Sequence, residues 1–146
     1  MLEVKKNDIY TVIIEDMVDK GFGVGKHQGF VIFIKGAFIG DVVRTKIVKV
    51  KKGYAYGRVE EILEPSKDRV VPKCPIADKC GGCQILPMSY EAQLAFKQRK
   101  VEELFKRAGL WDGIKFHAIL GMENPWFYRN KAQFPVGKDK DGKLAI

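Results

Sequence analysis

The chain has 146 residues, enough for one ordinary domain or two small ones, and 46% of them are hydrophobic, so a buried core is feasible. Its formal net charge is +8, which favours a polyanionic partner over an acidic or neutral one. The sequence has no signal-peptide pattern, and its longest apolar run, residues 30–34, is far too short to cross a bilayer. We therefore expect a cytoplasmic protein with no membrane partner.

The first part of the chain carries the signature of a small β-barrel. Short runs rich in β-branched and aromatic residues alternate with glycine turns, a pattern typical of closed or nearly closed barrels. Strands are predicted over residues 9–14, 29–34, 41–50 and 54–63.

Three alternating glycines, Gly21, Gly23 and Gly25, lie between the first two predicted strands. They resemble a dinucleotide-binding glycine motif only loosely, and no βαβ pattern follows them. We interpret them as a bend in the barrel. Residues 65–68 mark the expected boundary between a barrel domain, residues 1–64, and a second part, residues 65–146.

The second part is predicted to contain one long helix. Ser89 can cap it, Glu91 suits its first turn, apolar residues recur at helical spacing, and Gly109 can end it. We expect this helix over residues 90–108, strands over 115–120 and 127–136, and a hairpin turn at 139–142. Because the sequence stops in what would be the return strand, we expect a fragment of a longer protein.

A run of basic residues follows the start of the third predicted strand. No acidic residue lies between Asp41 and Glu60, and two tyrosines are interleaved with the cations. Lysine and arginine pair with phosphates, and aromatic rings stack on unpaired bases. The alternative is a solvated strand face whose edge is protected by lysines. The candidate RNA-binding residues are Arg44, Lys46, Lys49, Lys51, Lys52, Tyr54, Tyr56 and Arg58.

The three cysteines, Cys74, Cys80 and Cys83, lie in one short C-x5-C-G-G-C run. Closely spaced thiolates with glycines between them suit a metal ion or an iron–sulfur cluster. A tetrahedral zinc site and a four-iron cluster each need four ligands, so one is missing, borrowed or not a cysteine. His27 or His117 could complete a zinc site in a non-enzymatic RNA-binding module, which is our alternative prediction.

These features occur in a recognisable order. A glycine-punctuated basic barrel is followed by C-x5-C-G-G-C-Q, a helix beginning Ser-Tyr-Glu-Ala-Gln, and Tyr-Arg-Asn-Lys-Ala-Gln-Phe. This order resembles the N-terminal part of the S-adenosylmethionine-dependent RNA (uracil-5-)-methyltransferases that act on 23S ribosomal RNA. The resemblance implies a mainly β fold with one long helix, in which an OB-like TRAM barrel precedes the start of a β-rich central domain.

The resemblance also implies roles for residues. Cys74, Cys80 and Cys83 match three of the four ligands of a [4Fe-4S] cluster, and none of them is catalytic. Arg129, Lys131 and Gln133 become candidate RNA contacts; on a strand they would share one face. The S-adenosylmethionine pocket and the catalytic residues would lie in a later domain, so this chain alone should be an inactive, monomeric RNA binder.

Overall fold

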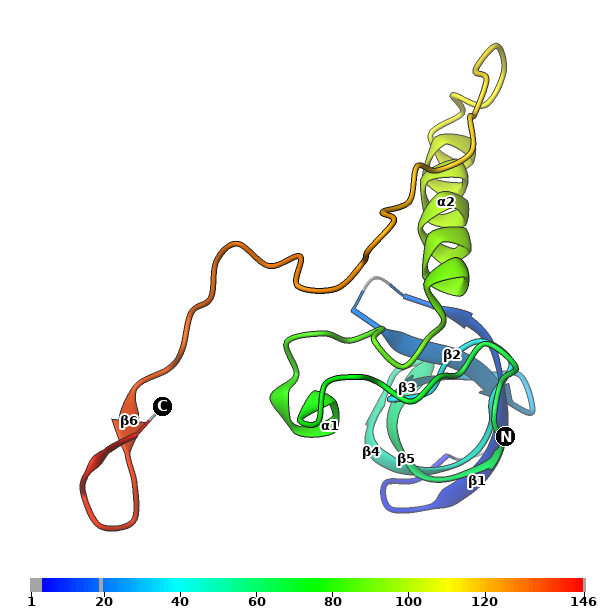
Figure 1. The fold of residues 1–146 in the computed structure, drawn as a ribbon. Helices are drawn as coiled ribbons and strands as arrows, with labels where there is room; N and C mark the ends of the chain where they lie inside the picture. Colours follow the sequence, from blue (N-terminus) through cyan, green and yellow to red (C-terminus); the bar gives the residue numbers. More distant parts are fainter. Residues whose placement is uncertain (1–3, 19, 146) are drawn as a thin grey trace.

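The computed structural model describes residues 4–18 and 20–145. In these ranges the first part forms a closed barrel of β1 (Ile9–Met17), β2 (Phe22–His27), β3 (Phe30–Lys35), β4 (Val42–Lys51) and β5 (Tyr54–Glu64), shown in Figure 1. The strand order is β1-β2-β3-β5-β4, and β4 pairs with β1 to close it. The β3–β5 pair is parallel and the other pairs are antiparallel. The predicted mainly β fold is confirmed.

The barrel interior is filled by the alternate residues of each strand. Side chains in a strand point to opposite faces with a period of two, so every second residue reaches the core. On β3, for example, Ile32 and Ile34 are fully buried, while Val31, Phe33 and Lys35 are not. The strands also contribute Val12, Ile14, Val43, Ile47 and Ala55 to this core, and Val4 and Ala37 join it from outside the strands.

The predicted bend is correct at Gly21, which precedes β2, but wrong at Gly23 and Gly25, which lie in that strand. Gly23 and Gly25 occupy inward positions, where neighbouring strands leave no room for a side chain. A Cβ on Gly23 would lie 2.7 Å from the Ala37 carbonyl oxygen, and one on Gly25 would collide with Val12 and the carbonyl oxygen of Ile13. The glycines therefore allow close packing, but they also remove the apolar alternation that would have predicted the strand.

The second part contains the short helix α1 (Ala77–Cys80) and the long helix α2 (Tyr90–Arg107). As predicted, the Ser89 hydroxyl caps α2 by accepting a hydrogen bond from the Ala92 N–H at 3.2 Å, and Gly109 follows its end with a φ of 70°. Phe96 of α2 packs with Met17, Phe38 and Met88 in a second apolar cluster, separate from the barrel core. Within the described ranges, neither helix is long and apolar enough to cross a bilayer.

The two strands predicted after α2 are absent from the described chain. Residues 115–120 and 127–136 have no strand partner there, and Phe127 has a φ of 56°. Figure 1 shows the chain returning along α2 after the helix ends and then leading away from it toward β6. A strand requires a neighbour, and local composition does not say whether one is present. Only the predicted hairpin forms, from β6 (Gly137–Lys138) and β7 (Leu144–Ala145).

Candidate nucleic-acid interface and cysteine loop

The strand register brings basic and aromatic residues together on one side of the barrel. Lys49 of β4 pairs with Tyr56 of β5, which pairs in turn with Phe33 of β3. In the adjacent rows, Lys51 pairs with Tyr54, and Lys46 with Arg58 beside Lys35. We call this surface the barrel face; it comprises Phe22, Phe33, Lys35, Lys46, Lys49, Lys51, Tyr54, Tyr56 and Arg58.

Four aromatic rings form the centre of the barrel face. The Phe33 ring lies 5.6 Å from Tyr54 and 5.7 Å from Tyr56, and Phe22 lies 6.0 Å from Tyr56. The rings are partly exposed, so a base could stack on them. The neighbouring Tyr54 raises the pKa of Tyr56 above its ordinary value of 10.0.

The cations of the face differ in how they are engaged. Lys35, Lys49 and Lys51 are exposed around the aromatic rings, and Lys52 follows in the turn. In contrast, Arg58 forms an ion pair with Glu60 at 3.0 Å. Arg44, another predicted RNA contact, pairs with Glu61 at 2.9 Å, beside β1 and away from the aromatic cluster. Exposed ion pairs of this kind are weak, but their carboxylates compete with phosphates for the arginines. The exposed lysines are therefore the better candidates for binding phosphate.

Sequence reasoning missed Phe22, Phe33 and Lys35. Phe22 was missed because it lies in the glycine segment that was predicted to be a bend. Phe33 and Lys35 lay in or beside a predicted strand, at the outward positions that alternate with Ile32 and Ile34. Their alternation was a usable signal, but their position beside Tyr56 and Arg58 depends on the parallel β3–β5 pairing, which joins residues distant in sequence.

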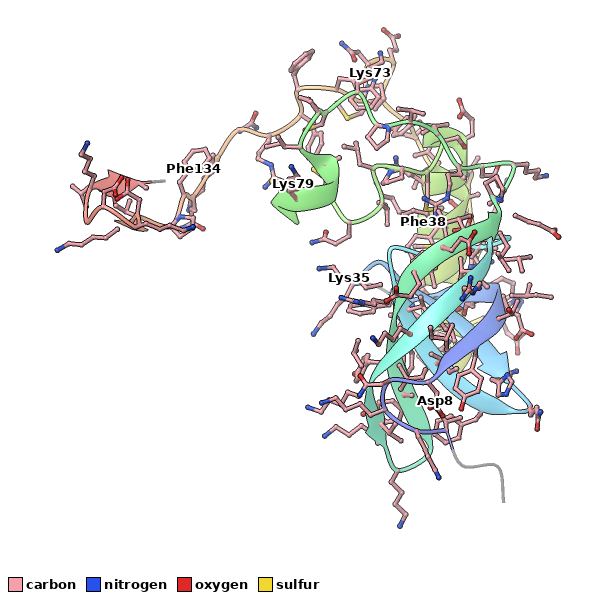
Figure 2. All side chains as sticks on the ribbon, turned by 90° about the horizontal axis from the view of Figure 1, so that it is seen from below. Asp8, Lys35, Phe38, Lys73, Lys79 and Phe134 are labelled. Carbon is pink, nitrogen blue, oxygen red and sulfur yellow. The ribbon has the colours of Figure 1, made fainter. Side chains whose placement is uncertain are left out.

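The cysteines lie on one loop over residues 74–83, which we call the cysteine loop. All three are free thiols, and α1 ends at Cys80 where Gly81 adopts a φ of 65°. A Cβ on Gly21 would lie 2.5 Å from the Cβ of Gln84, so the residue that follows the cysteine loop packs against the turn before β2. In Figure 2, Lys79 of the loop lies on the same side of the molecule as Lys35 of the barrel face.

Cys83 has two polar neighbours from a distant segment. Its Sγ lies 3.3 Å from the Tyr128 hydroxyl, and the Arg129 guanidinium lies 3.7 Å away. The same guanidinium donates to the Gly82 carbonyl oxygen at 2.9 Å. The hydrogen bond with Cys83 raises the pKa of Tyr128, although Arg129 partly opposes this. Arg129 is thus placed at the cysteine loop, whereas Lys131 and Gln133 are exposed farther along the extended segment.

A zinc ion requires its ligands to meet at one point. Ligands of a single zinc ion must all lie about 2.0–2.3 Å from it. Within residues 4–18 and 20–145, no three cysteine, histidine or acidic side chains are placed around one such point. His27 packs on the Tyr10 ring at 4.2 Å, and His117 lies beside α2, where its backbone carbonyl accepts from Gln98.

An iron–sulfur cluster makes a different demand, because its cysteines bind separate iron atoms and need not meet at one point. Three free thiols on a glycine-containing loop provide the right donors for such a cluster. The donor chemistry of the cysteine loop therefore fits a cluster.

Comparisons with known proteins agree with this architecture. Residues 3–59 match the TRAM domain family. Proteins named uncharacterized RNA methyltransferase are similar to nearly the whole chain: one from Halalkalibacterium halodurans is 46% identical over 142 residues, covering 97% of this chain and 31% of that protein. Relatives from Clostridium tetani (48% identity, 99% and 31% covered) and Staphylococcus aureus (43%, 100% and 32%) have the same name.

The chain spans about a third of the length of these curated relatives. The match includes both the barrel and the cysteine loop, since it covers at least 97% of the chain in each of the three. The chain therefore contains a TRAM domain, and over nearly its whole length it is similar to about a third of the length of proteins named uncharacterized RNA methyltransferase.

Proposed function

We propose that this chain is the RNA-binding and cluster-bearing part of an S-adenosylmethionine-dependent RNA uridine C5-methyltransferase that acts on 23S ribosomal RNA. The observation that carries the proposal is the barrel face, where the register sets Lys49 and Lys51 beside Tyr56, Tyr54 and Phe33. Lysines bind the phosphates of an RNA strand and aromatic rings stack on its unpaired bases. The similarity to proteins named uncharacterized RNA methyltransferase supports a methyltransferase parent; the uridine C5 and 23S specificity rest on the sequence resemblance.

The chemistry of the reaction explains why such a surface is useful. An enzyme that modifies C5 of a structured uridine has to extrude the base from its stack, which costs a few kcal/mol. Contacts at the barrel face, remote from the reacting base, supply binding free energy that offsets this cost. We assign methyl transfer itself to the part of the parent protein outside this chain, so the chain alone should bind RNA without methylating it.

The cysteine loop has a separate role in this proposal. Cys74, Cys80 and Cys83 would hold three irons of a [4Fe-4S] cluster, with a fourth cysteine from outside this chain. When bound, the cluster would cross-link the loop. Tyr128 and Arg129 contact the Cys83 sulfur, and donors at a sulfur stabilise the negative charge that a thiolate ligand carries.

The RNA-binding proposal is tested by fluorescence anisotropy with single-stranded oligoribonucleotides from 23S ribosomal RNA. Replacing Tyr54 and Tyr56 together with Ala should weaken binding by at least about tenfold, since stacking contributes about 1–3 kcal/mol per base. Phe134→Ala, which removes an exposed aromatic ring outside the barrel face, is the matched control. Equal affinities for the wild type, the double variant and the control would remove the barrel face as the RNA site.

Two further measurements test whether the chain alone transfers methyl groups and whether the protein holds an iron–sulfur cluster. Incubation of this chain with RNA and S-adenosylmethionine carrying a labelled methyl group should leave the RNA unlabelled, and incorporation would contradict our assignment. Iron and acid-labile sulfide, measured in the anaerobically purified full-length gene product, should be about four of each per chain. Zinc, or no metal, would remove the cluster from the proposal.

A further inference from the structure

A cavity of about 500 Å³ lies next to the cysteine loop and apart from the barrel face. Its walls come from three segments: the linker after the barrel, the stretch from Gly82 into α2, and residues 122–128. The volume is within the range of small-molecule sites, about 300–1,000 Å³. Figure 2 shows Lys73, one of its lining residues, among the side chains gathered beside α2.

Hydrogen bonds and close packing hold these walls together. The Met122 N–H donates to the Tyr90 hydroxyl at 2.8 Å, which ties the third segment to α2. A Cβ on Gly121 would lie 2.8 Å from the Leu94 side chain, so the segment runs directly against the helix. In the linker wall, the Val70 N–H donates to the Pro87 carbonyl at 2.8 Å. Contacts between the three segments therefore hold the walls of the cavity in place.

The lining combines flat aromatic surface with cations. Trp126, Tyr90 and Tyr128 contribute rings, and the Lys73 ammonium lies 4.8 Å from the centre of the Trp126 ring. Lys97 of α2 adds a second cation. The Gln93 amide nitrogen donates to the Met88 carbonyl at 3.0 Å, which leaves its side-chain oxygen as an acceptor at the wall. Aromatic surface, phosphate-binding cations and an amide are the groups that recognise a nucleotide.

We infer that this cavity binds one unpaired base of the RNA, stacked on Trp126, with its phosphate at Lys73 and Lys97. The inference rests on the proposed RNA-binding function and adds a second anchoring point to it. Cys83 at the end of the cysteine loop and the next residue, Gln84, both line the cavity, and Gln84 packs against Gly21 just before β2, so this stretch lies between the cavity and the barrel. A base held in the cavity is an anchor and not the base that is methylated.

The two tryptophans of the chain make a direct test available. Trp111 stacks on Phe116 at a ring distance of 5.0 Å, beyond the end of α2 and outside the cavity. In Trp111→Phe, all tryptophan emission comes from Trp126; in Trp126→Phe, it comes from Trp111. A single-stranded oligoribonucleotide from 23S ribosomal RNA should quench Trp126 emission in step with binding measured by anisotropy, and leave Trp111 emission nearly unchanged.

Affinity gives a second readout. Trp126→Ala should weaken RNA binding about tenfold, while Trp126→Phe, which keeps a ring for stacking, should retain most of the affinity. Circular dichroism of each variant shows whether the chain remains folded. If Trp111→Phe binds RNA by anisotropy without quenching of Trp126, the cavity inference is overturned and the barrel face stands. If neither the wild type nor any variant binds RNA, the proposed function fails as well.

Discussion

The carboxylate of Asp41, just before β4, is fully buried and accepts hydrogen bonds from the guanidinium of Arg69 in the segment after the barrel. The Nε–Oδ1 distance is 3.1 Å. The N–H groups of Phe38 and Ser66 donate to the same carboxylate at 2.7 and 2.8 Å, so its oxygens are well satisfied. Arg69 also donates to the Gly36 carbonyl at 3.0 Å. This pair fixes the second part of the chain to the barrel.

Replacing Arg69 with Met should therefore destabilise the fold strongly. The change leaves the Asp41 carboxylate buried without its cationic partner, and broken buried pairs of this kind cost about 3–5 kcal/mol. Urea denaturation followed by circular dichroism measures the loss. Arg44→Gln is the control, because it breaks the exposed pair with Glu61 and should cost at most about 1 kcal/mol. Similar losses in the two variants would show that the Asp41–Arg69 pair contributes no more than a surface pair.

The same carboxylate predicts how stability depends on pH. Burial raises the pKa of Asp41, but hydrogen bonds from Arg69 and from the Ser66 and Phe38 N–H groups outweigh it, so the pKa lies below its ordinary value of 3.8. A group with a depressed folded-state pKa stabilises the fold above the ordinary pKa, and this stabilisation is lost as the pH falls through the folded value.

We therefore expect the free energy of unfolding to fall as the pH drops below about 4, and to fall less in Asp41→Asn over the same interval. Urea denaturation at a series of pH values from neutral into the acid range measures both slopes. Parallel curves for the wild type and Asp41→Asn would mean that other carboxylates carry the acid sensitivity.

The sequence predicted the barrel strands well where apolar and polar residues alternate, and poorly where they do not. β-branched runs identified four strands, but β2 was hidden because glycines occupy its inward positions, as at Gly25. The strand expected around Arg129 failed for another reason, since no neighbouring strand is present in the described chain to pair with it. Likewise, composition located the cations near Lys49, but only the non-local β3–β5 pairing places Phe33 beside them. Local patterns cannot specify such pairings.

The glycines of β2 provide a test of this account. A Cβ on Gly25 would overlap the Val12 side chain and the Ile13 carbonyl, so Gly25→Ala forces the two strands apart. Overpacking in a core costs about 1–3 kcal/mol, measured here as a lowered urea midpoint. Gly137→Ala in β6 is the control, since a Cβ added there would meet nothing within 4 Å. An unchanged midpoint for Gly25→Ala would contradict the close approach of β1 and β2.

The lysines of β4 and its turn should determine the salt dependence of RNA binding. Replacing Lys49, Lys51 and Lys52 with Ala removes up to three phosphate contacts, which should lower affinity and reduce the magnitude of the log–log salt slope by about 2. The control replaces three exposed lysines of the C-terminal hairpin, Lys138, Lys140 and Lys143. Anisotropy titrations at several salt concentrations give the slopes. If both triple variants changed the slope equally, the effect would reflect net charge and not the barrel face.

Arg129 could act as an RNA contact or as a hydrogen-bond donor to the cysteine loop, and the sequence could not distinguish these two roles. It was a predicted RNA contact, yet its guanidinium donates to Gly82 and contacts the Cys83 sulfur. Losing charge-assisted hydrogen bonds worth about 1.5–3 kcal/mol should make Arg129→Gln release iron to a chelator roughly tenfold faster in the reconstituted full-length protein, with RNA affinity little changed.

Lys131→Gln, which removes a nearby positive charge on the same extended segment, is the matched control and should retain iron like the wild type. Iron release is followed by the loss of cluster absorbance, and RNA affinity by anisotropy on the same preparations. The opposite pattern, with iron retained and RNA affinity reduced in Arg129→Gln, would restore Arg129 as an RNA contact. Because the contacts with Gly82 and Cys83 both use Nη2, such a result would assign phosphate binding to Nε and Nη1.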